Sequence, residues 1–139
     1  MSAKAICNLC PRECRLDDGK LGVCRGRRNV EGRIVCDNYG ELTSIALDPI
    51  EKKPLSRFHP GSMILSVGSY GCNLTCPFCQ NSSISMIGPR QAQTTYVSPE
   101  ALVDAATNTV DKGNIGIAFT YNEPFISYEY IRDTALIAR

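Results

Sequence analysis

A short loop that holds three cysteines is the feature that most restricts how this chain can fold. Cys72, Cys76 and Cys79 follow the spacing C-x3-C-x2-C, and the aromatic Phe78 directly precedes the last of them. The loop follows an apolar run at 63–67, which predicts a β-strand. Packing alone explains three thiols after a strand poorly. The pattern therefore predicts a metal cluster with three protein ligands and one open position.

The cysteine content favours a metal or redox protein over a disulfide scaffold. The chain has 139 residues, eight of them cysteine, with 15 basic and 14 acidic side chains. Residues 1–7 lack an apolar signal core, and no apolar run approaches the ~20 residues that span a bilayer. We therefore expect a cytoplasmic protein with reduced thiols. The balanced charge predicts no binding to nucleic acid or membranes, and the single histidine, His59, disfavours a histidine-based site.

Four more cysteines lie within the first 30 residues. Cys7, Cys10, Cys14 and Cys24 are separated by two, three and nine residues, and little apolar sequence surrounds them. Four thiolates on one zinc ion, or on a second iron–sulfur cluster, would stabilise a segment that cannot bury enough apolar surface. Four unligated thiols in a loop are the alternative. Cys36 stands apart and is expected to be a buried strand thiol.

The rest of the first 60 residues predicts a hairpin and a connector. Residues 33–37 and 42–47 are β-prone and flank a turn sequence at 38–41, so we expect them to pair. Residues 48–55 hold two prolines and four charged side chains, which favours an extended surface connector. We expect residues 1–60 to form a cysteine-rich amino-terminal module.

A helix is predicted between Ser98, a good N-cap, and Gly113, a good C-terminal stop. Pro99 suits the first helical position. The face of this helix carries Leu102, Ala106 and Val110. Residues 81–97, which precede it, are expected to be mostly loop with one helical turn.

Residues 61–139 are expected to alternate between strand and helix. The run 115–119 predicts a parallel strand that is covered on both faces, and a last helix is predicted at 125–138. The face of that helix carries Phe125, Tyr128, Ile131 and Ala135. The order gives a βαβ crossover with one further helix. Because chemistry in such sheets lies at the carboxyl ends of the strands, the loops 68–81 and 120–124 should be neighbours.

The cysteine loop resembles the C-x3-C-x-aromatic-C motif of the radical S-adenosylmethionine (SAM) superfamily. The stretches 48–55, 60–62, 71–73 and 79–81 are similar to the radical SAM proteins of the AmmeMemoRadiSam system, which are related to pyruvate formate-lyase activating enzyme. The four amino-terminal cysteines and residues 119–124 also match that family. The resemblance covers essentially the whole chain.

The resemblance implies a [4Fe–4S] cluster on Cys72, Cys76 and Cys79, with SAM bound to the fourth iron. It implies reductive cleavage of SAM to methionine and a 5′-deoxyadenosyl radical, which takes hydrogen from a substrate that the sequence does not identify. Electrons would come from a donor such as flavodoxin or ferredoxin.

The resemblance also implies three SAM-binding residues. Phe78 is expected near the adenine. Asn122 and Glu123 lie where the superfamily carries Gly-Gly-Glu, and Glu123 matches the carboxylate that contacts the SAM amino group. Tyr121 stands where a glycine is more usual. The alternative for Glu123 is a carboxylate that stabilises a helix N-terminus.

The fold class implied is α/β: about two βα units from the amino-terminal part of a radical SAM partial TIM barrel, preceded by the cysteine-rich module. The superfamily barrel has six such units, so we expect 61–139 to be an incomplete, truncated barrel whose second strand has an unpaired edge. One alternative function is a glycyl-radical enzyme activase with a protein substrate. An alternative of another class is a non-catalytic, cysteine-rich metal-binding fragment.

Overall fold

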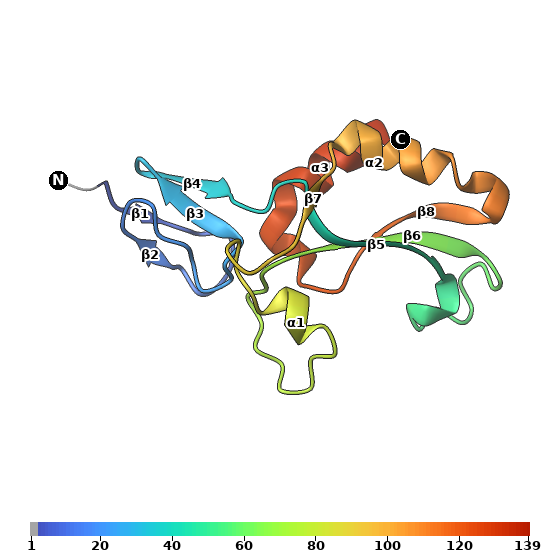
Figure 1. Cartoon of the computed structure of the whole chain (residues 1–139), viewed down its shortest axis with the longest axis horizontal. Coiled ribbons are helices and arrows are strands. Elements are labelled where there is room, and N and C mark those ends of the chain that lie inside the picture. Colours follow the sequence, from blue (N-terminus) through green and yellow to red (C-terminus); the bar gives the residue numbers. More distant parts are fainter. Residues whose placement is uncertain (1–2) are drawn as a thin grey trace.

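A four-stranded sheet with two helices on one face organises most of the chain (Figure 1). The computed structural model describes residues 3–139, so Met1 and Ser2, which open the predicted 1–60 module, lie outside the described residues. The strand order is β7-β5-β6-β8. The bounds are Glu41–Pro49 for β5, Met63–Ser69 for β6, Thr95–Tyr96 for β7 and Asn114–Phe119 for β8.

The predicted βαβ crossover is confirmed. β6 and β8 pair in parallel, and the helix α2 (Pro99–Thr107) connects them. The last helix, α3 (Tyr128–Ile137), packs beside α2 on the same side of the sheet. β5 pairs antiparallel with both β6 and β7. As expected, β8 lies at the edge, with no further partner among the strands of residues 3–139.

The predicted hairpin between 33–37 and 42–47 is wrong. β4 (Arg33–Cys36) pairs with the preceding β3 (Arg27–Val30), while β5 joins the central sheet. Glu31 and Gly32, between β3 and β4, have φ angles of 51° and 85°. Two successive positive φ angles are typical of the tight turns that match the twist of a hairpin. The turn therefore lies before residue 33 rather than at 38–41.

A second, smaller hairpin begins the described chain. β1 (Ala5–Ile6) pairs with β2 (Arg15–Leu16), and both lie beside the β3–β4 hairpin at one end of the molecule (Figure 1). Residues 3–36, which hold these two hairpins, are the part of the expected 1–60 module that precedes the central sheet, and we call this part the amino-terminal module. The module contacts α3 through Arg27, which donates hydrogen bonds to Glu129 at 2.5 and 2.8 Å.

The predicted surface connector at 48–55 is only partly extended and only partly exposed. β5 continues to Pro49, and a short 3-10 helix, η1 (Ile50–Lys52), follows. Asp48 and Ile50 are buried. The composition predicted an exposed connector because three charged residues and two prolines surround these two inward-facing side chains.

The core lies between the sheet and the two helices. Its buried members are Leu42, Leu65, Val67, Leu102, Ala106 and Tyr130. The Tyr130 ring meets the rings of Tyr39 and Phe119 edge-on, with centroids 5.2 and 6.0 Å away. Edge-to-face contacts of this kind add to the stabilisation from area burial alone.

Both predicted helix faces need correction. α2 begins as predicted, with Ser98 Oγ accepting the Ala101 N–H, but it ends at Thr107. A separate 3-10 turn, η2 (Val110–Lys112), leaves Val110 exposed before Gly113, whose φ is 85°. In the last helix Phe125 and Tyr128 are exposed, and the buried set is Ile126, Ser127, Tyr130 and Thr134.

The shift in the last helix follows from how it starts. The 3-10 helix η3 (Pro124–Ser127) precedes α3. A 3-10 helix has 3.0 residues per turn instead of 3.6, so a single helical period across 125–138 misplaces the buried stripe. Within residues 3–139 no helix has the length and apolar character needed to cross a membrane.

Candidate functional site

The cysteine loop and the turn after β8 enclose one pocket. The loop leaves the carboxyl end of β6 and hangs from the sheet on the side opposite α2 and α3, together with the short helix α1 (Ser82–Ser85) (Figure 1). The pocket has a volume of about 180 Å³. It is lined by the sequence-predicted Cys72, Cys76, Cys79, Asn122 and Glu123, and by Leu74, Ser85, Met86 and Tyr121. The loops 68–81 and 120–124 are therefore neighbours, as expected.

Asn122 joins the two loops directly. Its Nδ2 donates to the Gly71 carbonyl at 2.9 Å, and its Oδ1 accepts the Ser69 N–H at 3.3 Å. Both bonds connect the turn after β8 with the end of β6, immediately before Cys72. The sequence assigned Asn122 to SAM, whereas the structure gives its amide group a positioning contact.

Glu123 lies at the pocket and also begins the helix η3. Its Oε1 accepts the Phe125 N–H at 3.1 Å. The sequence-based alternative, a carboxylate at a helix N-terminus, therefore describes this contact correctly. This bond uses Oε1, so Oε2 is available to a ligand in the pocket.

Phe78 lies outside the group that lines the pocket. Its side chain is 82% exposed. The structure therefore brings together the three cysteines and Glu123, but it leaves the predicted adenine contact on the surface of the loop.

The three cysteines line a pocket and do not converge on one point. Within residues 3–139, no three Cys, His, Asp or Glu side chains are gathered closely enough to hold one metal ion, and the cysteines are free thiols. Each cysteine of an iron–sulfur cluster binds a different iron, so its ligands need to surround a pocket rather than meet at one point. Cys72, Cys76 and Cys79 surround one pocket.

The amino-terminal cysteines lie in two neighbouring loops. Cys7 and Cys24 are buried, and Cys10 and Cys14 are half-buried. The Cys7 N–H donates to the Cys14 carbonyl at 2.9 Å. A Cβ on Gly22 would lie 3.7 and 3.8 Å from the sulfurs of Cys14 and Cys24, so these two sulfurs share one neighbourhood.

Cys36 belongs to neither group. It lies in β4, and its Sγ donates to Asn38 Oδ1 at 3.3 Å. Burial raises the pKa of this thiol to about 11. A thiol with such a pKa stays protonated at neutral pH, in line with the predicted strand role, although Cys36 is half-buried rather than fully buried.

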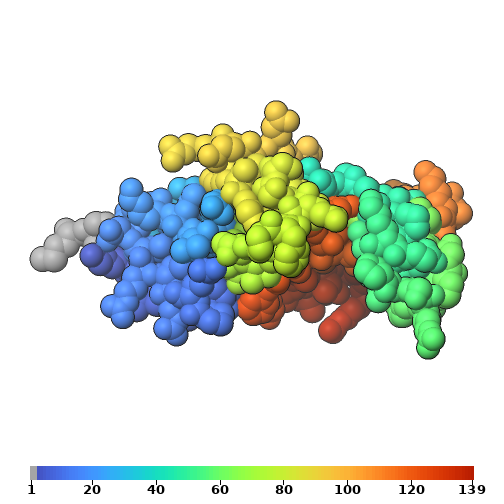
Figure 2. Space-filling model, turned by 90° about the horizontal axis from the view of Figure 1, so that it is seen from below, coloured from blue at the N-terminus to red at the C-terminus, as the bar shows by residue number. Residues whose placement is uncertain are grey.

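The amino-terminal module contacts the cysteine loop. Arg12 Nε donates to the Asn73 carbonyl at 2.8 Å. Figure 2 shows the module (blue) directly against the segment that contains the cysteine loop (yellow-green). Asn73 Oδ1, beside Cys72, is buried and has no hydrogen-bond partner among residues 3–139.

Sequence reasoning missed one polar cluster beside the site. The Tyr121 hydroxyl donates to Asp48 Oδ2 at 2.9 Å, and Lys52 and Lys53 donate to the same carboxylate. Burial alone would raise the pKa of Asp48, but the hydrogen bonds from the two lysines hold it well below its usual range. The only signal in the sequence was Tyr121 itself, a side chain at a position where a glycine is more usual.

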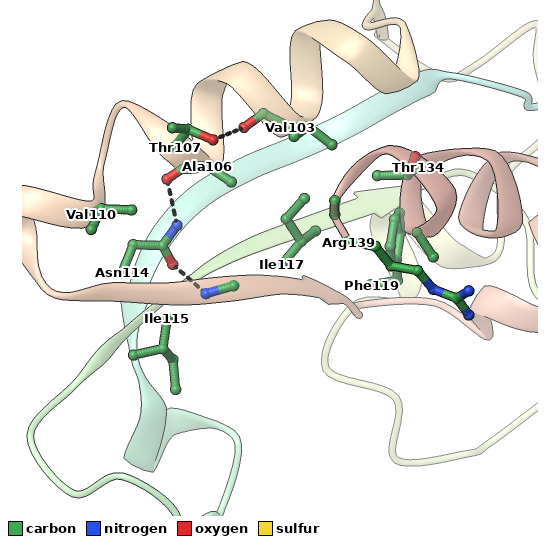
Figure 3. Close-up of a pocket in the computed structure, with 13 residues that line it drawn as sticks. Val103, Ala106, Thr107, Val110, Asn114, Ile115, Ile117, Phe119, Thr134 and Arg139 are labelled. Atoms are coloured by element: carbon green, nitrogen blue, oxygen red, sulfur yellow. Dashed lines mark hydrogen bonds between the residues drawn. The ribbon is translucent and has the colours of Figure 1, made fainter.

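A larger cavity lies elsewhere and lacks such chemistry. A cavity of about 500 Å³ opens between α2, β8 and α3 (Figure 3). Val103, Val110, Ile117 and Phe119 line it, and Arg139 is the one charged residue among the described residues of its wall. We therefore place the candidate site at the smaller pocket, where the thiols and Glu123 meet.

Comparison with known proteins shows the family of the chain. Residues 66–139 match the family model described as the Radical SAM superfamily. The uncharacterized protein MJ0808 of Methanocaldococcus jannaschii is 40% identical over 136 residues, which cover 98% of this chain and 40% of that protein. The chain thus spans about two fifths of the length of this relative. No solved structure matches the chain.

Proposed function

Because the chain belongs to the radical SAM superfamily, we propose that it binds a [4Fe–4S] cluster through Cys72, Cys76 and Cys79. One observation carries this proposal: the three thiols line a single pocket together with the Glu123 carboxylate. Thiolates are the usual ligands of such clusters. A carboxylate next to them suits the positively charged amino group of SAM.

The chain's own residues would divide the work at this pocket. The three thiolates hold the cluster. The Glu123 oxygen that is not bonded to Phe125 N–H accepts the amino group of SAM, and Asn122 keeps the two loops together. A pocket of about 180 Å³ is smaller than the ~300–1,000 Å³ typical of small-molecule sites. The adenosine part of SAM would therefore need contacts beyond this pocket, and the exposed Phe78 is the residue that we propose for the adenine.

When bound, the cluster supplies the electron that cleaves SAM to methionine and a 5′-deoxyadenosyl radical. Such a radical would take a hydrogen atom from the substrate. We propose an electron donor such as flavodoxin or ferredoxin, and a cytoplasmic location that keeps the thiols reduced. A glycyl-radical enzyme activase, which acts on a protein, is the alternative activity that the family resemblance suggests.

We further propose that residues 61–139 are the first two βα units of a partial TIM barrel. The parallel β6–β8 pair with α2 between its strands supports this interpretation. The unpaired edge of β8 and the apolar cavity beside it are where a third unit would pack. Since the matched relative is much longer than this chain, the substrate-binding walls would come from further units.

The four amino-terminal cysteines form a second candidate site, for zinc or a second cluster. The shared neighbourhood of the Cys14 and Cys24 sulfurs supports it. In the described structure the four sulfurs do not converge as zinc requires, so binding would need the 7–14 loop to close. Metal analysis of protein with Cys7, Cys10, Cys14 and Cys24 changed to serine tests this site: an unchanged zinc and iron content would exclude it.

Anaerobic reconstitution with iron and sulfide tests the main proposal. We expect a brown protein whose reduced-cluster EPR spectrum changes when SAM is added. Replacement of Cys72, Cys76 and Cys79 by alanine should abolish the SAM-responsive signal, whereas Cys36→Ala, the matched control, should preserve it. A colourless protein that holds only zinc would contradict the proposal and favour a non-catalytic metal-binding fragment.

A further inference from the structure

Tyr121 has a backbone conformation that tyrosine rarely adopts. Its φ angle is 72°, in the left-handed region that favours glycine. Its ring occupies space that Gly68 leaves empty, because a Cβ on Gly68 would lie 2.7 Å from Tyr121 Cδ2. Both residues lie where the β6 and β8 strands end. A side chain kept in an unfavourable conformation needs contacts that compensate for it.

A buried polar cluster provides those contacts. The Tyr121 hydroxyl donates to Asp48 Oδ2 at 2.9 Å, and Lys53 Nζ donates to the same oxygen at 3.0 Å. Lys53 Nζ also lies 5.0 Å from the centroid of the Tyr121 ring, within the range of a cation–π contact. Asp48 is 5% exposed. The carboxylate and the ammonium group thus hold both the hydroxyl and the ring.

The next residue along the chain, Asn122, is held by the end of β6. Asn122 is bonded to the Gly71 carbonyl and the Ser69 N–H, and Glu123 follows at the pocket. The turn is therefore anchored at consecutive residues, by β5 through Tyr121 and by β6 through Asn122. Asp48 is 73 positions from Tyr121 in the sequence, so no local preference of the chain creates this arrangement.

We propose that Tyr121, held by Asp48 and Lys53, is a positioning residue that fixes the turn of Asn122 and Glu123 against the cysteine loop. The part of this inference that concerns SAM rests on the proposed function. The part that concerns the turn rests on the contacts alone. A glycine at position 121 would remove both the backbone strain and the connection to β5. Tyr121→Phe would remove only the hydrogen bond to Asp48, so the two variants together separate the strain from the contact.

Hydrogen exchange of the metal-free protein tests the turn without any cofactor. The reporter is the Ser69 amide, which donates to Asn122 Oδ1. We expect Tyr121→Phe to speed its exchange several-fold, and Tyr121→Gly to do so at least as strongly. The matched control is Tyr39→Phe, which also removes a tyrosine-to-aspartate bond (Tyr39 OH to Asp133, 2.7 Å), and it should leave Ser69 unchanged. Equal exchange in wild type and both Tyr121 variants overturns the proposal, as does an equal effect of Tyr39→Phe.

The SAM affinity of the reconstituted protein provides the second readout, measured from the EPR change of the reduced cluster. Loss of one hydrogen bond that positions the turn should weaken SAM binding by about three- to tenfold in Tyr121→Phe. If the wild type binds SAM and Tyr121→Phe binds it with the same affinity, the proposal is overturned. A wild type that shows no SAM response contradicts the proposed function instead, and the Ser69 exchange rate then decides the positioning role alone.

Discussion

The backbone of Cys24 lies directly against Gly71: a Cβ on Gly71 would be 2.4 Å from the Cys24 carbonyl oxygen. Gly71 also has a φ angle of 83°. The amino-terminal module therefore contacts the chain at the residue immediately before Cys72. Only a residue without a side chain allows this approach.

We predict that Gly71→Ala destabilises the fold by at least ~2 kcal/mol, because it combines a left-handed conformation with a steric clash. The measurement is urea-induced unfolding. Gly61→Ala is the matched control, since Gly61 has a φ of 81° but open space around its Cα. Its conformational cost alone should be about 1 kcal/mol. Equal losses in the two variants would mean that the contact with Cys24 is not needed for stability.

The Arg27–Glu129 pair should make stability depend on pH in the acid range. The hydrogen bond from Arg27, whose side chain is 7% exposed, lowers the pKa of Glu129. A lowered folded-state pKa means that this stabilisation is complete above the unfolded value of ~4.3 and is lost as the pH falls through the folded value. Stability should therefore fall below about pH 4 in wild type and depend less on pH in Glu129→Gln.

The same variant should lose about 3 kcal/mol at pH 7, because it leaves the Arg27 charge buried and unpaired. Chemical unfolding at several pH values measures both effects. Asp17→Asn provides the comparison, because Asp17 pairs with Lys4 on the surface, where ion pairs contribute little. If Glu129→Gln behaved like Asp17→Asn, the pair would not hold the module to α3.

Asn114 should be essential to the start of β8. It is buried. Its Nδ2 donates to the Ala106 carbonyl at 2.9 Å, and its Oδ1 accepts the Gly116 N–H at 3.2 Å (Figure 3). The same Oδ1 also accepts the Leu65 N–H at 3.0 Å. Asn114→Ala leaves the Ala106 carbonyl and the N–H groups of Leu65 and Gly116 without this side-chain partner, which should cost about 2 kcal/mol or more in unfolding free energy. Thr107→Ala, which removes an exposed bond to Val103, should change stability much less. Similar losses in both variants would contradict the prediction.

Glu123 should affect SAM binding more than stability. Glu123→Gln keeps an oxygen that can accept the Phe125 N–H but removes the charge that would meet the SAM amino group. We expect an unchanged unfolding midpoint and about tenfold weaker SAM binding, since hydrogen bonds between charged groups are about twice as strong as neutral ones. Glu123→Ala should lower both the unfolding midpoint and the affinity for SAM. Wild-type SAM affinity in Glu123→Gln would remove Glu123 from the binding site.

The parts of the fold that the sequence predicted are those with local signals. Ser98 capped α2 as expected, and the apolar runs at 63–67 and 115–119 marked β6 and β8. The pairing of β5 could not be predicted in this way. Its partner β6 lies beyond η1 and a long turn, so the rule that neighbouring strands pair selected the wrong partner.

The candidate site also has parts that the sequence predicted and parts that it did not. The cysteine spacing predicted which thiols share a pocket, and the strand order predicted that Glu123 would join them. The connection from Tyr121 to Asp48 spans 73 positions and depends on a positive φ angle that no residue pattern indicates. Phe78 differs from these residues, because its motif position predicts a contact with SAM while its side chain is exposed outside the pocket lining.

The contact between Arg27 and Glu129 also bears on the order of folding. The two residues are 102 positions apart, and contacts between such distant residues are slow to form because the intervening chain must first be ordered. Ribosomal synthesis produces Arg27 102 residues before Glu129. The amino-terminal module therefore leaves the ribosome well before the helix that it contacts, and it can reach its final contacts only after α3 has been made.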